Sequence, residues 1–226
     1  MIGSVLIYFM KIPDRDTEEI FNEQTFWETF KEGVIYVNES RVLQVVVLTT
    51  IFINLFLVGP MSMGLPLFVK NILNGNAMDF SLLEAGVAVG MLIGSVIIGV
   101  LNLTKNRGKI ALISLFVSGL AFALLSFTTE RWVSIFMLII FGACLSATNI
   151  PFTSAIQSMI EEKVLGRVMG LISLASMGLI PVSYAITAFI LSLGISIHYI
   201  MAGGAILVVM YTFFVYVNFQ ELRNVD

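Results

Sequence analysis

Few side chains within the apolar parts of this chain could do chemistry. Across its six long apolar runs, Glu84 is the only acidic residue and His198 is the only other side chain that could carry a charge. An ionisable group buried among membrane-spanning helices can bind an ion or relay protons. Glu84, however, is the fifth residue of the run that begins at Phe80. We therefore expect Glu84 to lie at the membrane interface, within reach of water, and not to act as a proton carrier.

Hydrolytic and metal chemistry have little support in this sequence. An intramembrane hydrolase needs a buried nucleophile with a base beside it. His198, the only histidine, lies near one end of the last run, and the chain has no Gly-x-Ser-x-Gly nucleophile turn. Cys144 is the only cysteine, which excludes a disulfide within the chain and a cysteine metal site, so we expect it to be a small packing residue. We predict no catalytic residue, no metal site and no cofactor.

Helix-breaking residues are the next chemical signal. A backbone carbonyl that is freed inside lipid is costly unless it lines a cavity or meets a polar partner. Three places within the runs carry such residues: Gly59 with Pro60 in the first run, Pro151 in the fourth, and Pro181 in the fifth. We predict a hinge at each of these places.

Two intramembrane amides lie near these breaks. Asn54 is near the middle of the first run, and Asn149 is two residues before Pro151. An isolated asparagine in this setting either contacts a ligand or forms a hydrogen bond between helices worth roughly 1 kcal/mol. The residue type favours neither interpretation, so both stay open at this point.

Six long apolar runs must position these side chains. A bilayer core of about 30 Å requires roughly 20 helical residues to cross it, and every run is close to or above that length. Barrel strands need only about 9 to 11 alternating residues, so continuous runs of this length predict helices. Apolar residues make up 58% of the 226 residues and charged residues 12%, and the mean hydropathy is +0.97. We predict an all-α polytopic membrane protein whose spans are Val42–Val69, Phe80–Leu103, Ile110–Phe127, Trp132–Phe152, Val168–Leu191 and Ile195–Phe219.

The basic residues predict the orientation, because cells retain Lys and Arg on the cytoplasmic side of short loops. With the segment before the first span placed inside, the outer loops carry only Lys70 and Arg131, so both ends of the six-helix block face the cytoplasm. No basic strip suggests a nucleic-acid partner. The inner loops then carry the other ten basic residues: Lys11, Arg15, Lys31, Arg41, Lys105, Arg107, Lys109, Lys163, Arg167 and Arg223.

The chain divides into four parts. Residues 1–10 are apolar but too short to span and lack the flanks of a signal peptide, so we expect the end of a truncated helix with further sequence upstream. Residues 11–41 carry eight acidic and four basic residues with apolar side chains at near-helical spacing, which predicts an amphipathic cytoplasmic linker. Residues 42–219 form the bundle, and 220–226 form a cytoplasmic tail. Within the bundle, Gly86, Gly90 and Gly94 form a stripe that predicts a closely packed helix pair.

Two stretches of this sequence resemble a known family. They read NLFLVGPMSMGLPLFVKNIL, from Asn54 to Leu73, and NIPFTSAIQSMIEEKVLGRVMGL, from Asn149 to Leu171. Both look like the second half of a major facilitator superfamily transporter, in the bacterial branch that includes macrolide-efflux and enterobactin-export permeases. The resemblance implies that the chain supplies helices seven to twelve of such a transporter, and that its partner is a missing N-terminal six-helix half.

The resemblance also implies a substrate cavity. Two spans, which begin at Ile110 and Ile195, would lie outside it. Met and aromatic side chains adapt to varied apolar ligands, while amides orient polar atoms. Four spans would line the cavity, namely those that begin at Val42, Phe80, Trp132 and Val168. We predict that a small-molecule substrate contacts Asn54, Met61, Asn149 and Tyr184.

Two neighbouring cytoplasmic turns carry charges that could pair when the inner face closes. Exposed ion pairs are worth only about 0 to 1 kcal/mol each, so a gate would need a network of them. The simpler alternative is that these charges keep helix ends in water and fix the topology. The predicted gate residues are Lys105, Arg107, Lys109, Glu161, Glu162 and Arg167.

We therefore predict the C-terminal half of a secondary active exporter of small, amphipathic molecules in the bacterial inner membrane, working by alternating access. If the complete protein is a proton antiporter, as the resemblance implies, its coupling carboxylate should lie in the missing half. A single bundle has no opposing repeat to rock against. The alternative is therefore a non-transporting fragment or an interaction partner of another half, and an intramembrane hydrolase is a distant third.

Overall fold

The computed structural model describes residues 26–101 and 106–223. The predicted truncated helix at 1–10, linker residues 11–25, the gate residue Lys105 and the last three residues of the tail lie outside this part. Within it, every regular element is helical. The elements in chain order are α2 (Phe26–Glu39), α3 (Arg41–Ile53), η1 (Asn54–Val58), α4 (Gly59–Ser62), α5 (Gly64–Asn71), α6 (Ala77–Leu101), α7 (Arg107–Leu125), α8 (Arg131–Met159), α9 (Glu162–Ser192), α10 (Ile197–Asn218) and α11 (Gln220–Arg223).

Six helices of the described part are long and apolar enough to cross a membrane, which confirms the predicted all-α polytopic fold. The first span is continuous from α3 to α5, and the other five are α6, α7, α8, α9 and α10. The fourth and fifth helices extend beyond the predicted apolar runs. Helix α8 ends at Met159 where the run ended at Phe152, and α9 starts at Glu162 where the run started at Val168. Polar residues continue both helices past their apolar segments.

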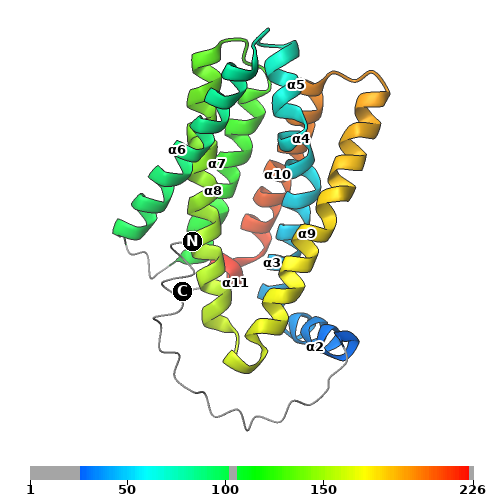
Figure 1. Cartoon of the computed structure of the whole chain (residues 1–226). Helices are drawn as coiled ribbons and strands as arrows, with labels where there is room; N and C mark the ends of the chain where they lie inside the picture. Colours follow the sequence, from blue (N-terminus) through cyan, green and yellow to red (C-terminus); the bar gives the residue numbers. More distant parts are fainter. Residues whose placement is uncertain (1–25, 102–105, 224–226) are drawn as a thin grey trace, which may run out of the picture.

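The helices form two pairs held together by a third (Figure 1). Helix α6 packs along α8, and the first span packs along α9. Helices α7 and α10 pack against each other, α7 also against α8, and α10 also against the first span. The two outer pairs meet directly where α5 approaches α6, at the end of the bundle that carries Asp79. We call this the Asp79 end, and the opposite end, where α8 turns into α9, the Glu161 end.

Glycine explains the close approach of α6 and α8. A Cβ added at Gly90 would lie 2.1 Å from the carbonyl oxygen of Ile139, and one at Gly94 would lie 2.3 Å from that of Ala143. The Ser146 hydroxyl of α8 donates a hydrogen bond of 3.0 Å to the Met91 carbonyl of α6. Small residues permit such backbone contact between membrane helices. The predicted helix pair at the glycine stripe is therefore α6 with α8.

Two apolar clusters hold the bundle together. The larger one fills the middle and the Asp79 end, where the ring centroids of Phe122 and Phe141 lie 5.2 Å apart. The smaller one lies at the Glu161 end and joins α2, α3, α8, α9 and α10 through Val37, Leu43, Ile156, Val168 and Val215. Ser40 separates α2 from α3, because its side chain accepts a hydrogen bond from the Leu43 N–H and so starts the first span. The observed part of the linker is thus a helix that packs on the bundle.

Candidate substrate groove

An open groove of about 580 Å³ lies between the first span and α6, towards the Asp79 end. This volume is within the range of sites that hold drug-sized molecules. Met61, Ser62 and Leu65 come from α4 and α5 on one side. The other side is α6, which contributes Phe80, Ser81, Glu84, Ala85, Val87, Ala88 and Met91. The groove has mainly apolar walls with two hydroxyls and one carboxylate.

Glu84 is the charged residue of this groove. Its side chain is exposed, and no residue of the described part forms an ion pair with it. It lies seven residues after the start of α6, which at 1.5 Å per residue is about 10 Å along the helix. The sequence had indicated an interfacial carboxylate in contact with water. The structure adds that this carboxylate lines a groove, which the sequence could not show because the other wall comes from a different span.

The four predicted substrate contacts do not come together in this groove. Met61 lines it. Asn54 begins η1 and its amide donates to the Thr50 carbonyl of its own helix at 2.8 Å, which favours a local structural role. Asn149 is exposed on α8, and Tyr184 is 37% exposed on α9. The substrate contacts of these residues remain predictions.

The first predicted hinge coincides with an irregular backbone. Residues Asn54–Val58 form a π-helix, in which each turn is wider than in an α-helix, directly before Gly59 and Pro60. In a regular helix the Pro60 nitrogen would donate to a carbonyl one turn earlier, but proline has no N–H. A polar partner is therefore needed for a carbonyl in the preceding turn.

Ser183 of α9 supplies a polar partner to the neighbouring carbonyl, that of Leu55. Its hydroxyl donates to the Leu55 carbonyl at 2.7 Å and accepts from the Gly59 N–H at 2.8 Å. In an α-helix these two backbone groups would bond to each other, so the hydroxyl is inserted between them. Glycine is required here, because a Cβ at Gly59 would lie 2.5 Å from the Ser183 hydroxyl and 2.6 Å from that of Thr187. We call this arrangement the Ser183 clasp.

The other two predicted hinges lie in continuous helices. Pro151 is buried within α8, and Pro181 is exposed within α9. Near Pro151, the Thr148 hydroxyl donates to the Cys144 carbonyl at 2.8 Å. Motion at Gly59, Pro60, Pro151 or Pro181 remains a prediction.

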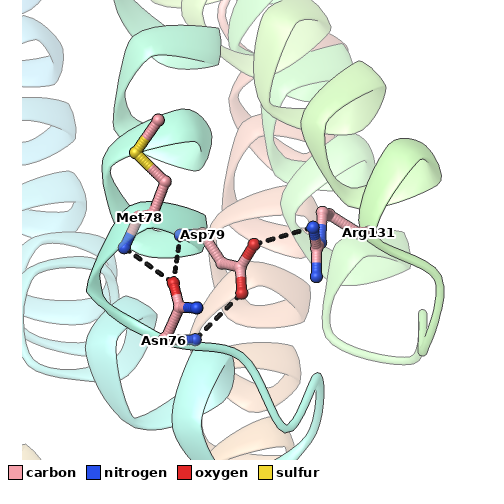
Figure 2. Close-up of polar contacts among 4 residues, drawn as sticks. All are labelled: Asn76, Met78, Asp79 and Arg131. Atoms are coloured by element: carbon pink, nitrogen blue, oxygen red, sulfur yellow. Dashed lines mark hydrogen bonds and ion pairs between the residues drawn. The ribbon is translucent and has the colours of Figure 1, made fainter.

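An ion pair joins α6 to α8 at the Asp79 end (Figure 2). Asp79 is 3% exposed, and its carboxylate pairs with the Arg131 guanidinium at 2.9 Å. Its other oxygen accepts from the Asn76 N–H at 2.9 Å, while the Asn76 side chain accepts from the N–H groups of Met78 and Asp79. These reciprocal bonds form a capping box at the start of α6. Asp79 and Arg131 therefore stabilise the contact between α6 and α8.

At the Glu161 end, Arg167 pairs with Glu32 of α2. Next to this pair, a Cβ on Gly33 would lie 3.3 Å from the Arg167 carbonyl oxygen, so α2 is in close contact with α9. Lys109 and Glu161 are exposed at the starts of α7 and α9. Arg107 and Glu162 also lie at these two helix starts, so the structure places the described gate residues at one end of the bundle. A gate formed by them remains a prediction.

His198, the only possible base for hydrolysis, does not line the groove. The Ser196 hydroxyl and His198 Nδ1 are 2.9 Å apart at the exposed start of α10, and only two residues separate them along the chain. In the described part, no group of three or more His, Cys, Asp or Glu side chains could hold a metal ion.

A second, apolar groove of about 220 Å³ lies between α7 and α10 and includes Leu112, Phe116 and Phe213.

Comparison with known proteins identifies the family of this chain. A family model described as transmembrane secretion effector, of the major facilitator type, matches residues 4–226. Macrolide efflux protein A of Streptococcus pyogenes is 22% identical over 233 aligned positions, covering 100% of this chain and 56% of that protein. The protein of the same name from Enterococcus faecalis is 24% identical over 177 positions, covering 76% of this chain and 53% of that protein. The MFS-type transporter YvqJ of Bacillus subtilis is 23% identical over 210 positions, covering 91% of this chain and 49% of that protein.

No solved structure matches the chain. The chain spans about half the length of the curated relatives it matches. The family match covers nearly the whole chain, and the six spanning helices agree with it. The chain is a multi-pass membrane protein that belongs to the transmembrane secretion effector family of the major facilitator superfamily.

Proposed function

We propose that this chain is the C-terminal six-helix half of a secondary active transporter that exports small, amphipathic molecules across the bacterial inner membrane. The observation that carries the proposal is the groove between the first span and α6, within a bundle that belongs to the transmembrane secretion effector family. Its volume and its apolar walls suit an amphipathic molecule of drug size. The names of the relatives support export, and their length supports a second half.

The arrangement of helices supports alternating access. The two outer pairs, α6 with α8 and the first span with α9, meet directly mainly where α5 approaches α6. In the proposed whole protein, the N-terminal half would cover the open side of the groove, and rocking of the two halves would expose it to each side in turn. The carboxylate that couples export to protons would lie in that half.

Accumulation of a macrolide in drug-sensitive bacteria tests the proposal. Cells that express the full-length protein should accumulate less drug than cells without it, and a protonophore should abolish the difference. Ala85→Trp should block export, because Ala85 lines the groove and the new side chain would fill it. Val100→Trp is the matched control, since Val100 is 78% exposed on the same helix and outside the groove. Equal accumulation with and without the protein, at equal abundance in the membrane, would refute export.

Thiol labelling tests the proposed orientation. Single cysteines at Asn106 and Val164, in a background without Cys144, should be protected from a membrane-impermeant reagent in intact cells and should react after lysis. Asn106 directly precedes α7 and Val164 lies in the first turn of α9, at the end of the bundle that the basic residues predict to be cytoplasmic. Labelling of both positions in intact cells would invert the topology.

A non-transporting interaction partner is the second candidate. A single six-helix bundle has no opposing repeat to rock against, so this candidate would act together with another bundle. It would be supported if the chain copurifies with another six-helix protein and export depends on both.

A further inference from the structure

We propose that the groove recognises the positively charged group of its substrate through the carboxylate of Glu84. This inference rests on the proposed function and names the substrate class, an amphipathic organic cation. Glu84 is the only ionisable residue among those that line the groove. Each of the remaining lining residues is apolar or carries a neutral hydroxyl.

The energetics of a membrane site favour a cation at this position. A carboxylate beside mainly apolar walls attracts a positive partner more strongly than one in bulk water does. Glu84 is exposed to the groove and has no such partner in the described part of the chain. Arg131, at the same end of the bundle, is paired with Asp79. A cationic ligand would therefore meet a carboxylate that is free to pair with it.

The position of Glu84 also predicts how the substrate lies. Residues Glu84, Ala88 and Met91 follow one face of α6 at spacings of four and three, and all three line the groove. From Glu84 to Met91 the groove extends about 10 Å along the helix. The charged group would lie near the Asp79 end, with the apolar body against Ala88, Met91 and Met61. The two methionines can adapt their shape to different ligands.

A basic side chain from the other half of the transporter is the competing occupant. A groove of about 580 Å³ holds far more than one side chain, and sites of this size typically bury a drug-sized ligand. These observations favour the small molecule, and the experiment below separates the two occupants.

Two probe ions of equal size and opposite charge, tetraphenylphosphonium and tetraphenylborate, test the inference. Their binding to the purified full-length protein, with both halves present, is measured in detergent by equilibrium dialysis against empty micelles. The protein should bind the cation more tightly than the anion. Glu84→Gln should weaken binding of the cation about tenfold, as expected for one charge pair in a partly hydrated groove, and should remove the preference over the anion.

Matched variants separate the groove from the rest of the surface. Glu130→Gln removes an exposed carboxylate at the same end of the bundle but outside the groove, so it should leave binding of both ions unchanged. Ala88→Lys places an ammonium one turn from Glu84 on the same face, where it would pair with the carboxylate. It should weaken binding of the cation as much as Glu84→Gln does. Circular dichroism should show the same helix content in all variants.

Three outcomes would overturn the inference. One is no binding of the cation by the protein, and another is equal affinity of the protein for the cation and the anion. The third is equal affinity of the protein and Glu84→Gln for the cation; a lower midpoint of thermal unfolding in that variant would then assign Glu84 to a basic side chain of the other half. Each of these results leaves the export of neutral molecules intact, because the accumulation assay tests export separately.

Discussion

Removal of the Ser183 hydroxyl should destabilise the whole bundle. Ser183→Ala deletes two hydrogen bonds, of 2.7 Å to the Leu55 carbonyl and 2.8 Å from the Gly59 N–H, at a side chain with no exposed surface. Hydrogen bonds between membrane helices are worth roughly 0.6 to 1.7 kcal/mol each, which gives about 1 to 3 kcal/mol for the pair. Both backbone groups lie in the apolar interior, so water cannot replace the hydroxyl there.

The free energy of unfolding of the full chain in mixed micelles measures this loss. The chain is titrated with a denaturing detergent, and the helix content is followed by circular dichroism. Ser176→Ala is the matched control, because Ser176 lies on the same helix and its hydroxyl donates to the Ile172 carbonyl of that helix at 2.8 Å. Its effect should stay within about 0.5 kcal/mol. If both variants unfold at the same detergent fraction, the clasp does not stabilise the bundle.

Three further changes test the packing described above. Gly90→Ala should lower the free energy of unfolding by about 1 to 3 kcal/mol, because its Cβ would meet a backbone oxygen of α8, whereas Gly99→Ala should change it little, since nothing lies within 4 Å of its Cβ. Asp79→Ala should cost about 1 to 3 kcal/mol in the same assay, because it removes a buried carboxylate that pairs with the half-exposed Arg131 and forms half of a capping box; an unchanged transition would contradict the role of this carboxylate. Glu32→Gln should speed hydrogen exchange in α2 with little change in global stability, as expected for a partly exposed ion pair, and Glu39→Gln should not.

The length of the apolar runs made the six spans predictable. A run of about 20 apolar residues leaves a helix as the structure that satisfies its own backbone in lipid. The ends were less predictable, because α8 and α9 continue with polar residues into the region beyond the apolar segments. The glycine stripe on α6 predicted a close helix contact, but small residues do not specify which helix makes it.

The candidate site was harder to predict because the first span is not a regular helix. Asn54 and Met61 are seven residues apart, and two turns of an α-helix would place them on nearly the same face. The π-helix between them widens one turn, which offsets the two faces by roughly 100°, the angle of one residue. Met61 lines the groove, while the Asn54 amide bonds to its own helix. Glycine and proline indicate a break in a helix, but they do not distinguish a kink, a hinge and a π-helix.

Two ionic contacts had partial signals in the sequence. Asn76 and Asp79 have the spacing of a capping box, which predicts the start of α6. The pairing of Asp79 with Arg131 depends on the packing of α6 against α8, and the pairing of Arg167 with Glu32 depends on how α2 docks. Both require long-range contacts that residue spacing does not encode.

The ion pair between Asp79 and Arg131 has a consequence for biosynthesis. The ribosome completes α6 two spans before α8, so a nascent chain that stops before Arg131 exposes the carboxylate and the glycine face of α6 without their partners. Nascent chains of this length should be degraded faster by membrane proteases than chains that extend past Met159. Helices α6 to α8 would thus fold as one cooperative unit after insertion. The π-helix of the first span would become stable only after α9 has been inserted and the Ser183 hydroxyl has bound to it.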